Sequence, residues 1–458
     1  MAVAVKKAPE MIKTTSQKTK VPTSGYFVPM IIIASLFFIF GFVTWINGAL
    51  IPFMKLVCEL SESQAYLVAT AVYISFVVMA LPASTLLKEI GYKNGMSIGL
   101  LIMAGGALLF IPAASSRIYS TFLLGLFIQG TGITVLQTAA NPYVTILGPI
   151  ESAAKRISIM GICNKVAGML GSAIFGVLLL SGLNEEMAKE KLSSNISNEE
   201  KEQLLNTLAD SVVVPYIVMA SLLIIFAFLI RFTPLPEIEN NSNSQDESNQ
   251  ETTKKHIFQF PHLLLGVLTL FAYVGAEVIA GDTIINYGLA LNIPKSEAKF
   301  FTSYTLGAMV FTYGLGVLLI PKYISQGMAL RISAVLGVIF SIGILVTEGY
   351  NSVLFVAALG IANALVWPAV WPLAINGLGK FTKTGAALLI MGVSGGAIIP
   401  PLFGAIVDNK KELLMASGMP EAKALADAYH THYWILIPCY LIILYYAVWG
   451  HKVGLAKK

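Results

Sequence analysis

Hydrophobic and polar positions alternate along this chain in long blocks. Polar connectors separate twelve apolar blocks, most of them about twenty residues or longer. A helix of about 20 apolar residues crosses the ~30 Å hydrocarbon core of a bilayer. The blocks lack the alternating ten-residue pattern of an outer-membrane barrel. They predict twelve transmembrane helices, at residues 26–50, 64–86, 96–114, 119–147, 157–182, 211–231, 260–288, 298–320, 328–347, 351–377, 384–407 and 432–450.

Two longer polar stretches divide the blocks. Residues 183–210 are rich in Glu, Lys, Asn and Ser, and residues 232–257 have the composition of a flexible linker. The second stretch separates six spans from six. We therefore expect an all-α polytopic membrane protein built as two six-helix halves. The expected parts are a disordered tail at 1–24, a half at 25–231, a linker at 232–257, a half at 258–452 and a tail at 453–458.

Composition excludes several other classes of protein. Only 12% of the 458 residues are charged, against about 25% in soluble proteins, which is too few to cover the surfaces of several soluble domains. The three cysteines are too scattered for a disulfide framework or a metal site. The chain has no Walker A sequence and no haem or iron–sulfur pattern. We expect no cofactor, no metal, no nucleic-acid partner and no enzymatic activity.

Basic residues in the connectors predict the orientation. With the N-terminus inside, the inner segments carry 19 Lys and Arg and the outer segments carry 10. Because cytoplasmic loops are enriched in Lys and Arg, this count favours both termini and the linker in the cytoplasm. We expect a multi-pass protein of the cell's inner membrane, acting as a monomer.

Three charged residues lie inside the predicted spans: Lys165 in the fifth, and Glu277 and Asp282 in the seventh. Each costs about 2.5–3.5 kcal/mol at the bilayer centre on insertion scales, so such residues usually face a cavity or each other. A Lys165–Glu277 pair would bridge the two halves. We expect Glu277, with Lys165, to bind a coupling proton or sodium ion, and Asp282 to lie at an outer gate. A structural ion pair, or an acid capping a broken helix, is the alternative.

Amide and aromatic side chains also follow the predicted helices. Gln137 and Asn141 share one face of the fourth span with Thr134, and Asn363, Trp367 and Trp371 recur one turn apart in the tenth. Amides bond sugar hydroxyls and rings stack on the C–H face, so the set suits a sugar. Interhelical hydrogen bonds are the alternative. The expected substrate contacts are Asn47, Gln137, Asn141, Asn164, Lys165, Tyr273, Glu277, Asn363, Trp367 and Trp371.

Four stretches carry a resemblance to a known family: Trp45–Pro52, Leu136–Thr145 with Leu147–Pro149, Tyr273–Val278, and Pro82–Ala83 through Gly91–Lys93. They resemble the major facilitator superfamily, in the branch that holds the fucose–proton symporter and the glucose/galactose transporters. The resemblance implies that fold, a sugar substrate and two halves that rock about a central site.

The chain departs from the fucose symporter at two acidic positions. That symporter has an Asp in the first span and a Glu in the fourth, and the matching residues here are Gly48 and Gln137. Neither side chain can take up a proton. Asn164 matches a span-five Asn of the symporter, and Glu277 stands where the symporter has Gln. The resemblance therefore implies that the coupling carboxylate lies in the second half.

These observations predict a secondary transporter that imports a monosaccharide by proton or sodium symport. The candidate sugars are a hexose, such as glucose or galactose, and an N-acetylhexosamine. A sugar uniporter, a drug or organic-ion exporter on the same fold, and a non-transporting sugar receptor stay open. A membrane-embedded enzyme is disfavoured because all five histidines fall near span ends.

Overall fold

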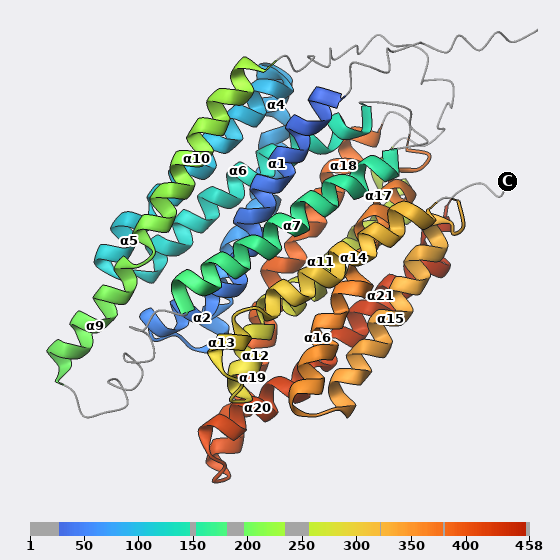
Figure 1. Cartoon of the computed structure of the whole chain (residues 1–458). Helices are drawn as coiled ribbons and strands as arrows, with labels where there is room; N and C mark the ends of the chain where they lie inside the picture. The colour runs from blue at the N-terminus through green and yellow to red at the C-terminus, as the bar shows by residue number, and fades with distance from the viewer. Residues whose placement is uncertain are drawn as a thin grey trace, which may run out of the picture.

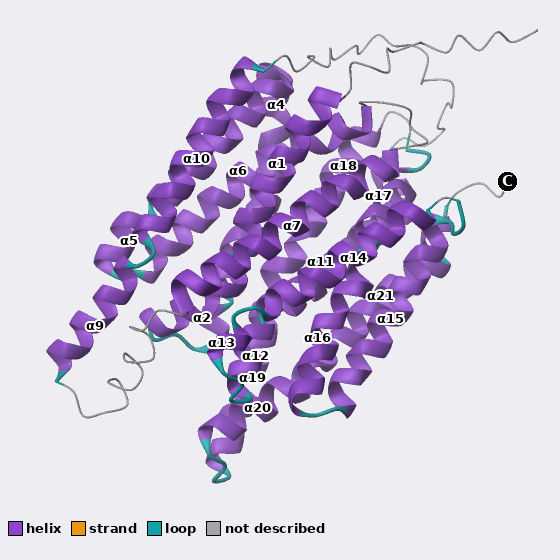
Figure 2. Cartoon of the chain, in the orientation of Figure 1, coloured by secondary structure: helices purple, strands orange, loops and turns teal. Residues whose placement is uncertain are grey.

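The computed structural model of the chain describes residues 27–146, 153–180, 197–233, 256–320, 322–378 and 381–454. These segments are helical, with turns between them (Figure 2). The predicted tail at 1–24, nearly all of the linker and the last four residues lie outside the described residues. Twelve helical segments are long and apolar enough to cross a membrane, as the sequence predicts.

The first half contains six of these segments (Figure 1). Its helices are α1 (Phe27–Trp45), α2 (Asn47–Val57), α3 (Glu62–Ala65), α4 (Leu67–Leu108), α5 (Phe110–Ser116), α6 (Tyr119–Ile146), α7 (Ala153–Leu180), α9 (Asn198–Asp210) and α10 (Val213–Phe232). The label α4 covers both the second and the third span. Gly91, with a φ of 79°, turns the backbone between the two. A left-handed φ favours glycine, which has no Cβ to clash.

The second half contains the other six. Its α-helices are α11 (Pro261–Asp282), α12 (Ile284–Ala290), α13 (Lys295–Ala298), α14 (Phe301–Leu319), α15 (Gln326–Val346), α16 (Gly349–Asn363), α17 (Val366–Ile375), α18 (Thr382–Met391), α19 (Gly395–Ala416), α20 (Glu421–His432) and α21 (Leu436–Val448). Short 3-10 turns are η2 (Ile257–Gln259), η4 (Gly392–Ser394), η5 (Tyr433–Ile435) and η6 (Gly450–Lys452).

Several spans are interrupted within their length. The first breaks between α1 and α2 at Ile46, the seventh between α11 and α12 at Thr283, and the eleventh at η4. Such discontinuous helices are typical of transporter binding sites. The block pattern of the sequence predicts the spans but not these breaks, because each break lies inside one long, mainly apolar block.

The bundle has two distinct ends in Figure 1. The start of α1 and the end of α10 lie at one end, which we call the tail face. Helices α9 and α20 lie at the opposite end, which we call the distal face. Helices α7 and α14 pack against each other across the halves, as do α4 and α19. The site described next lies between these contacts.

Candidate functional site

A cavity lies between the two halves. The first half contributes Trp45 from α1, Gln137 and Asn141 from α6, and Asn164 and Lys165 from α7. The second half lines it with Tyr273 and Glu277 from α11, Tyr313 from α14 and Trp367 from α17, among others. Cationic, anionic, amide, hydroxyl and aromatic groups therefore meet in one space at the interface of the halves.

The predicted Lys165–Glu277 pair is confirmed. Lys165 Nζ lies 2.9 Å from Glu277 Oε1, and the two side chains are 8% and 9% exposed. The Tyr273 hydroxyl, one helical turn before Glu277, donates to the same Oε1 at 2.8 Å. Removing two charges from water costs several kcal/mol per ion, which an ion pair with good geometry and further hydrogen bonds offsets. Glu277 thus accepts hydrogen bonds from Lys165 of the first half and Tyr273 of the second.

Trp45 and Asn164 position the lysine from the side of the first half. Lys165 Nζ lies 3.9 Å from the centroid of the Trp45 ring, a distance at which the ring attracts a cation. Trp45 Nε1 donates to Asn164 Oδ1 at 3.3 Å, and Asn164 Nδ2 donates to the Phe37 carbonyl at 3.4 Å. Asn164 therefore ties α7 to α1 while it also lines the cavity.

The cavity brings together most of the expected substrate contacts. It is lined by Gln137, Asn141, Asn164, Lys165, Tyr273, Glu277 and Trp367. Trp371 does not line it but stacks on Trp367, with ring centroids 5.5 Å apart. Asn363 is fully buried behind the lining and accepts from the Tyr440 hydroxyl at 2.8 Å. The Asn47 side chain lies outside the described residues, and substrate contact by any of these groups stays a prediction.

Asp282 lies apart from the cavity lining, at the end of α11. Its residue exposure is 2%. The preceding residue, Gly281, packs against the Trp45 ring, and its carbonyl accepts from Thr302 Oγ1 at 2.6 Å. A role for Asp282 at an outer gate stays a prediction. Other polar residues join the halves at the distal face.

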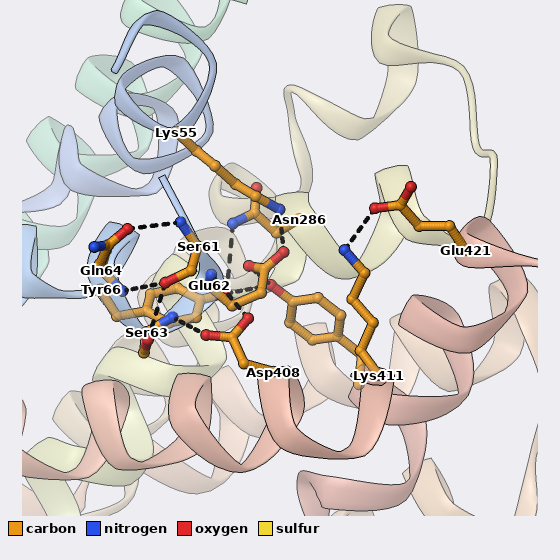
Figure 3. A network of polar contacts seen from close by, with 11 residues as sticks. Lys55, Ser61, Glu62, Ser63, Gln64, Tyr66, Asn286, Asp408, Lys411 and Glu421 are labelled. Atoms are coloured by element: carbon orange, nitrogen blue, oxygen red, sulfur yellow. Dashed lines mark hydrogen bonds and ion pairs between the residues drawn. The ribbon is translucent and has the colours of Figure 1, made fainter. Parts of the chain in front are cut away.

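Polar contacts join the halves at the distal face, through a group of residues that we call the distal cluster: Lys55, Glu62, Tyr66, Asp408 and Tyr429 (Figure 3). Asp408 of α19 accepts from the Glu62 and Ser63 backbone N–H groups at 3.0 and 2.8 Å. Those groups are free donors at the N-terminus of α3, so Asp408 caps a helix of the opposite half.

Hydroxyl and carboxylate groups complete the distal cluster. The Tyr429 hydroxyl donates to Glu62 Oε2 at 2.5 Å and lies 2.6 Å from the Tyr66 hydroxyl. Lys55 pairs with the other oxygen of Glu62. Gly404 allows this approach: a Cβ there would lie 2.7 Å from a Tyr66 ring carbon and 2.9 Å from Ser63 Cα. These contacts hold the two halves together at the distal face.

The sequence patterns do not single out several residues that line the cavity or join the two halves. Trp45 stands in a stretch that carries the family resemblance, which is a signal that could have been used. Tyr313 also lines the cavity, but nothing in the sequence separates it from the other 17 of the chain's 18 tyrosines. Glu62 and Asp408 lie in a connector or at a span end, where an acidic residue is common and carries no signal of its own.

Comparison with known proteins places this architecture in a family. The profile of the Major Facilitator Superfamily matches residues 33–401. A glucose/galactose transporter of Brucella abortus is 31% identical over 445 residues, which cover 96% of this chain and 97% of that protein. The L-fucose-proton symporter of Escherichia coli is 28% identical over 400 residues, covering 86% and 90%.

A solved structure agrees. The transporter FucP in its outward conformation superposes with a TM-score of 0.69 at 26% identity, covering 93% of this chain and 99% of that one. These relatives are transporters and symporters, in line with the expectation that the chain is not an enzyme. The chain is a multi-pass membrane protein, and it belongs to the Major Facilitator Superfamily.

Proposed function

We propose that this protein imports a monosaccharide together with a monovalent cation, by alternating access of its two halves to the cavity. The observation that carries the proposal is the buried Lys165–Glu277 pair, which crosses the halves at the cavity wall. Three amides and two tryptophans line the same cavity. The names of the relatives, which include glucose, galactose and fucose, support a sugar as substrate.

The chemistry of the pair gives a reason for coupling. A neutral sugar offers hydroxyl groups that can donate to Glu277 and accept from Lys165. If those hydroxyls entered without a cation, the two charges would be separated in a buried site, where losing a partner costs about 3–5 kcal/mol. A cation bound at the carboxylates offsets this cost. Sugar and cation therefore bind better together than either does alone.

The orientation follows from the charge count of the connectors. We assign the tail face, where α1 begins and α10 ends, to the cytoplasm, and the distal face to the outside. The closed distal cluster then makes this an inward-facing or occluded state. The two halves, at 25–231 and 258–452, act as the rocking bodies in a monomer of the inner membrane, with no cofactor besides the coupling ion.

Uptake into proteoliposomes tests the proposal. The purified protein is reconstituted and supplied with radiolabelled glucose, galactose, fucose or N-acetylglucosamine under a proton gradient or a sodium gradient separately. We expect one sugar to accumulate above its outside concentration under one gradient, and excess unlabelled sugar to block it. Protein-free vesicles are the control. If no sugar enters under either gradient, the proposal is wrong.

A sugar uniporter, an organic-ion exporter and a sugar receptor give different results in the same vesicles. A uniporter would equilibrate the sugar without accumulating it. An exporter would move an organic ion but none of the sugars, and a receptor would bind sugar without moving it. The buried charges at the cavity favour the coupled transporter over the uniporter, because an uncoupled sugar pathway has no need of them.

A further inference from the structure

The charges buried near the cavity do not balance. Within the spans that the structure describes, the buried Lys, Arg, Asp and Glu residues are Lys165, Glu277 and Asp282. One lysine therefore stands against two carboxylates. If all three are ionised, this group carries one net negative charge in a region that holds few water molecules.

Glu277 and Asp282 differ in their partners. Glu277 has Lys165 at 2.9 Å and the Tyr273 hydroxyl at 2.8 Å. The Asp282 carboxylate has neither a hydrogen bond nor an ion pair with any residue that the structure describes, although the residue is only 2% exposed. The lysine is thus committed to one carboxylate, and the second has no counter-charge in contact.

Asp282 nevertheless shares the electrostatic environment of the pair. The charged groups that reach it are Glu277, on its own helix, and Lys165, on α7. Tyr73, from α4, is the titratable group that reaches both carboxylates. The contacts at the neighbouring Gly281, from Trp45 and Thr302, bring no further charge. A change in the charge of Asp282 therefore alters the electrostatic energy of the Lys165–Glu277 pair.

An isolated buried carboxylate is costly, by several kcal/mol even after the protein relaxes. Such a group normally becomes neutral by taking up a proton. A sodium ion would need several oxygen ligands around it, as hard cations do. The nearby hydroxyls of Thr283 and Thr302 instead donate to main-chain carbonyls. A proton needs only the carboxylate.

We propose that Asp282 carries the coupling proton in this state, and that Lys165, Glu277 and Asp282 together fix the stoichiometry at one proton per sugar. The inference rests on the proposed symport and names its ion. One proton from the outside forms an O–H bond on an Asp282 oxygen and is released to the cytoplasm after the halves rock. The Lys165–Glu277 pair needs no further proton to be neutral.

The proposal makes Asp282→Asn and Glu277→Gln different kinds of change. Asp282→Asn keeps the Lys165–Glu277 pair, and the remaining two charges balance without a proton. Glu277→Gln leaves Lys165 to balance Asp282, but it removes the acceptor for Tyr273 and for Lys165. We expect both variants to lose coupling, and only Asp282→Asn to keep the sugar affinity of the unmodified protein within about threefold.

The test measures protons and sugar together in proteoliposomes. A pH-sensitive dye counts the protons that enter with each radiolabelled sugar, and a gradient of one pH unit sets the limit of accumulation. One coupled proton permits tenfold accumulation at that gradient and two permit a hundredfold. We expect one proton per sugar for the unmodified protein, accumulation and proton uptake absent in Asp282→Asn, and counterflow exchange retained there.

Matched variants make the outcome specific. Asp282→Glu keeps the carboxylate and should keep coupling, and Asp427→Asn, an exposed change on α20, should behave as the unmodified protein. Unimpaired accumulation and proton uptake in Asp282→Asn would overturn the inference, as would two protons per sugar. If Asp282→Asn does not insert, the stoichiometry of the unmodified protein still decides: one proton supports the inference, and zero or two oppose it.

Failure of the inference is distinguishable from failure of the proposed function. If Glu277→Gln is uncoupled while Asp282→Asn accumulates sugar normally, symport stands and Asp282 has no part in it. If the unmodified protein accumulates sugar only under a sodium gradient, the proton assignment is wrong and symport still stands. If the unmodified protein moves no sugar at all, the proposed function itself is wrong.

Discussion

Lys165 of α7 and Glu277 of α11 join the two halves of the bundle through a contact of 2.9 Å between Nζ and Oε1. The two residues lie 112 positions apart in the sequence and meet at the wall of the cavity. A buried pair of this kind is weak evidence for stability alone. Its position, where the halves must move against each other, is what connects it to transport.

Removing the lysine should be more harmful than removing both partners. Lys165→Gln leaves the buried Glu277 carboxylate without its counter-charge, and we expect the free energy of unfolding in detergent to fall by about 3–5 kcal/mol. The double variant Lys165→Gln/Glu277→Gln should recover part of that loss. Thermal unfolding of the purified proteins measures both. The control is Lys411→Gln, which breaks a pair with the exposed Glu421 and should cost at most about 1 kcal/mol. Equal losses in the single and double variants would contradict this account of the pair.

Side chains that line the cavity should control sugar affinity. Gln137→Ala and Trp367→Ala each remove a polar or stacking contact, and we expect each to raise the sugar Kd by roughly tenfold, equivalent to about 1.4 kcal/mol. Trp371, which only supports Trp367, should show a smaller effect when changed to Leu. Binding of radiolabelled sugar to the detergent-solubilised protein measures all three. An unchanged Kd in both lining variants would place the sugar elsewhere.

The tight packing at Gly404 gives a test of the closed distal face. A methyl group there would meet Tyr66 and Ser63 of the other half at less than 3 Å, so Gly404→Ala should favour the state with an open distal face. Gly105→Ala is the control, because no heavy atom lies within 4 Å of the added Cβ. A single cysteine at position 70, where Thr70 donates to the Ala397 carbonyl at 2.6 Å, reports opening through its labelling by an impermeant maleimide.

We expect the labelling rate of that cysteine to rise at least threefold with Gly404→Ala and to stay unchanged with Gly105→Ala. The background for both lacks the native cysteines, Cys58, Cys163 and Cys439. If labelling does not change in Gly404→Ala, the contact between α19 and the first half does not limit opening.

Asp408 should act on the same equilibrium through hydrogen bonds. Asp408→Asn keeps the size of the side chain but offers one acceptor oxygen in place of two, so one of the Glu62 and Ser63 N–H groups loses its partner. Loss of a helix cap costs about 0.5–2 kcal/mol, and only the closed state has this cap. The maleimide reaction at position 70 should accelerate accordingly. If the labelling rate equals that of the same single-cysteine protein with Asp408 unchanged, the cap does not stabilise the closed state.

Much of this arrangement could be predicted from the sequence, because a membrane-spanning helix tolerates few charged residues. Each charge in a span is costly, so Lys165 and Glu277 stood out among 458 residues and their pairing was predictable. The spacing of Tyr273 and Glu277 placed them one turn apart, where they form a hydrogen bond. The cost of burying a charge thus predicts the Lys165–Glu277 pair, and the helical period predicts that Tyr273 and Glu277 are neighbours.

The distal cluster could not be predicted in this way. Asp408 and Glu62 are separated by 346 positions. In the sequence both lie in a connector or at a span end, where a charged residue is common and does not stand out. The positions of Asn363 and Trp367 show a related limit. The two residues share a helical period, but α16 ends at Asn363 and α17 begins at Val366. Asn363 therefore turns to Tyr440 while Trp367 reaches the cavity.

The central claim is that Glu277 couples sugar movement to a cation, and Glu277→Gln tests it most directly. In proteoliposomes that hold either this variant or the exposed control Glu412→Gln, two rates are measured: uphill accumulation under a cation gradient, and counterflow exchange without one. We predict that Glu277→Gln abolishes accumulation and spares counterflow, while Glu412→Gln changes neither. Accumulation by Glu277→Gln at the level of the unmodified protein would remove Glu277 from the mechanism and contradict the account.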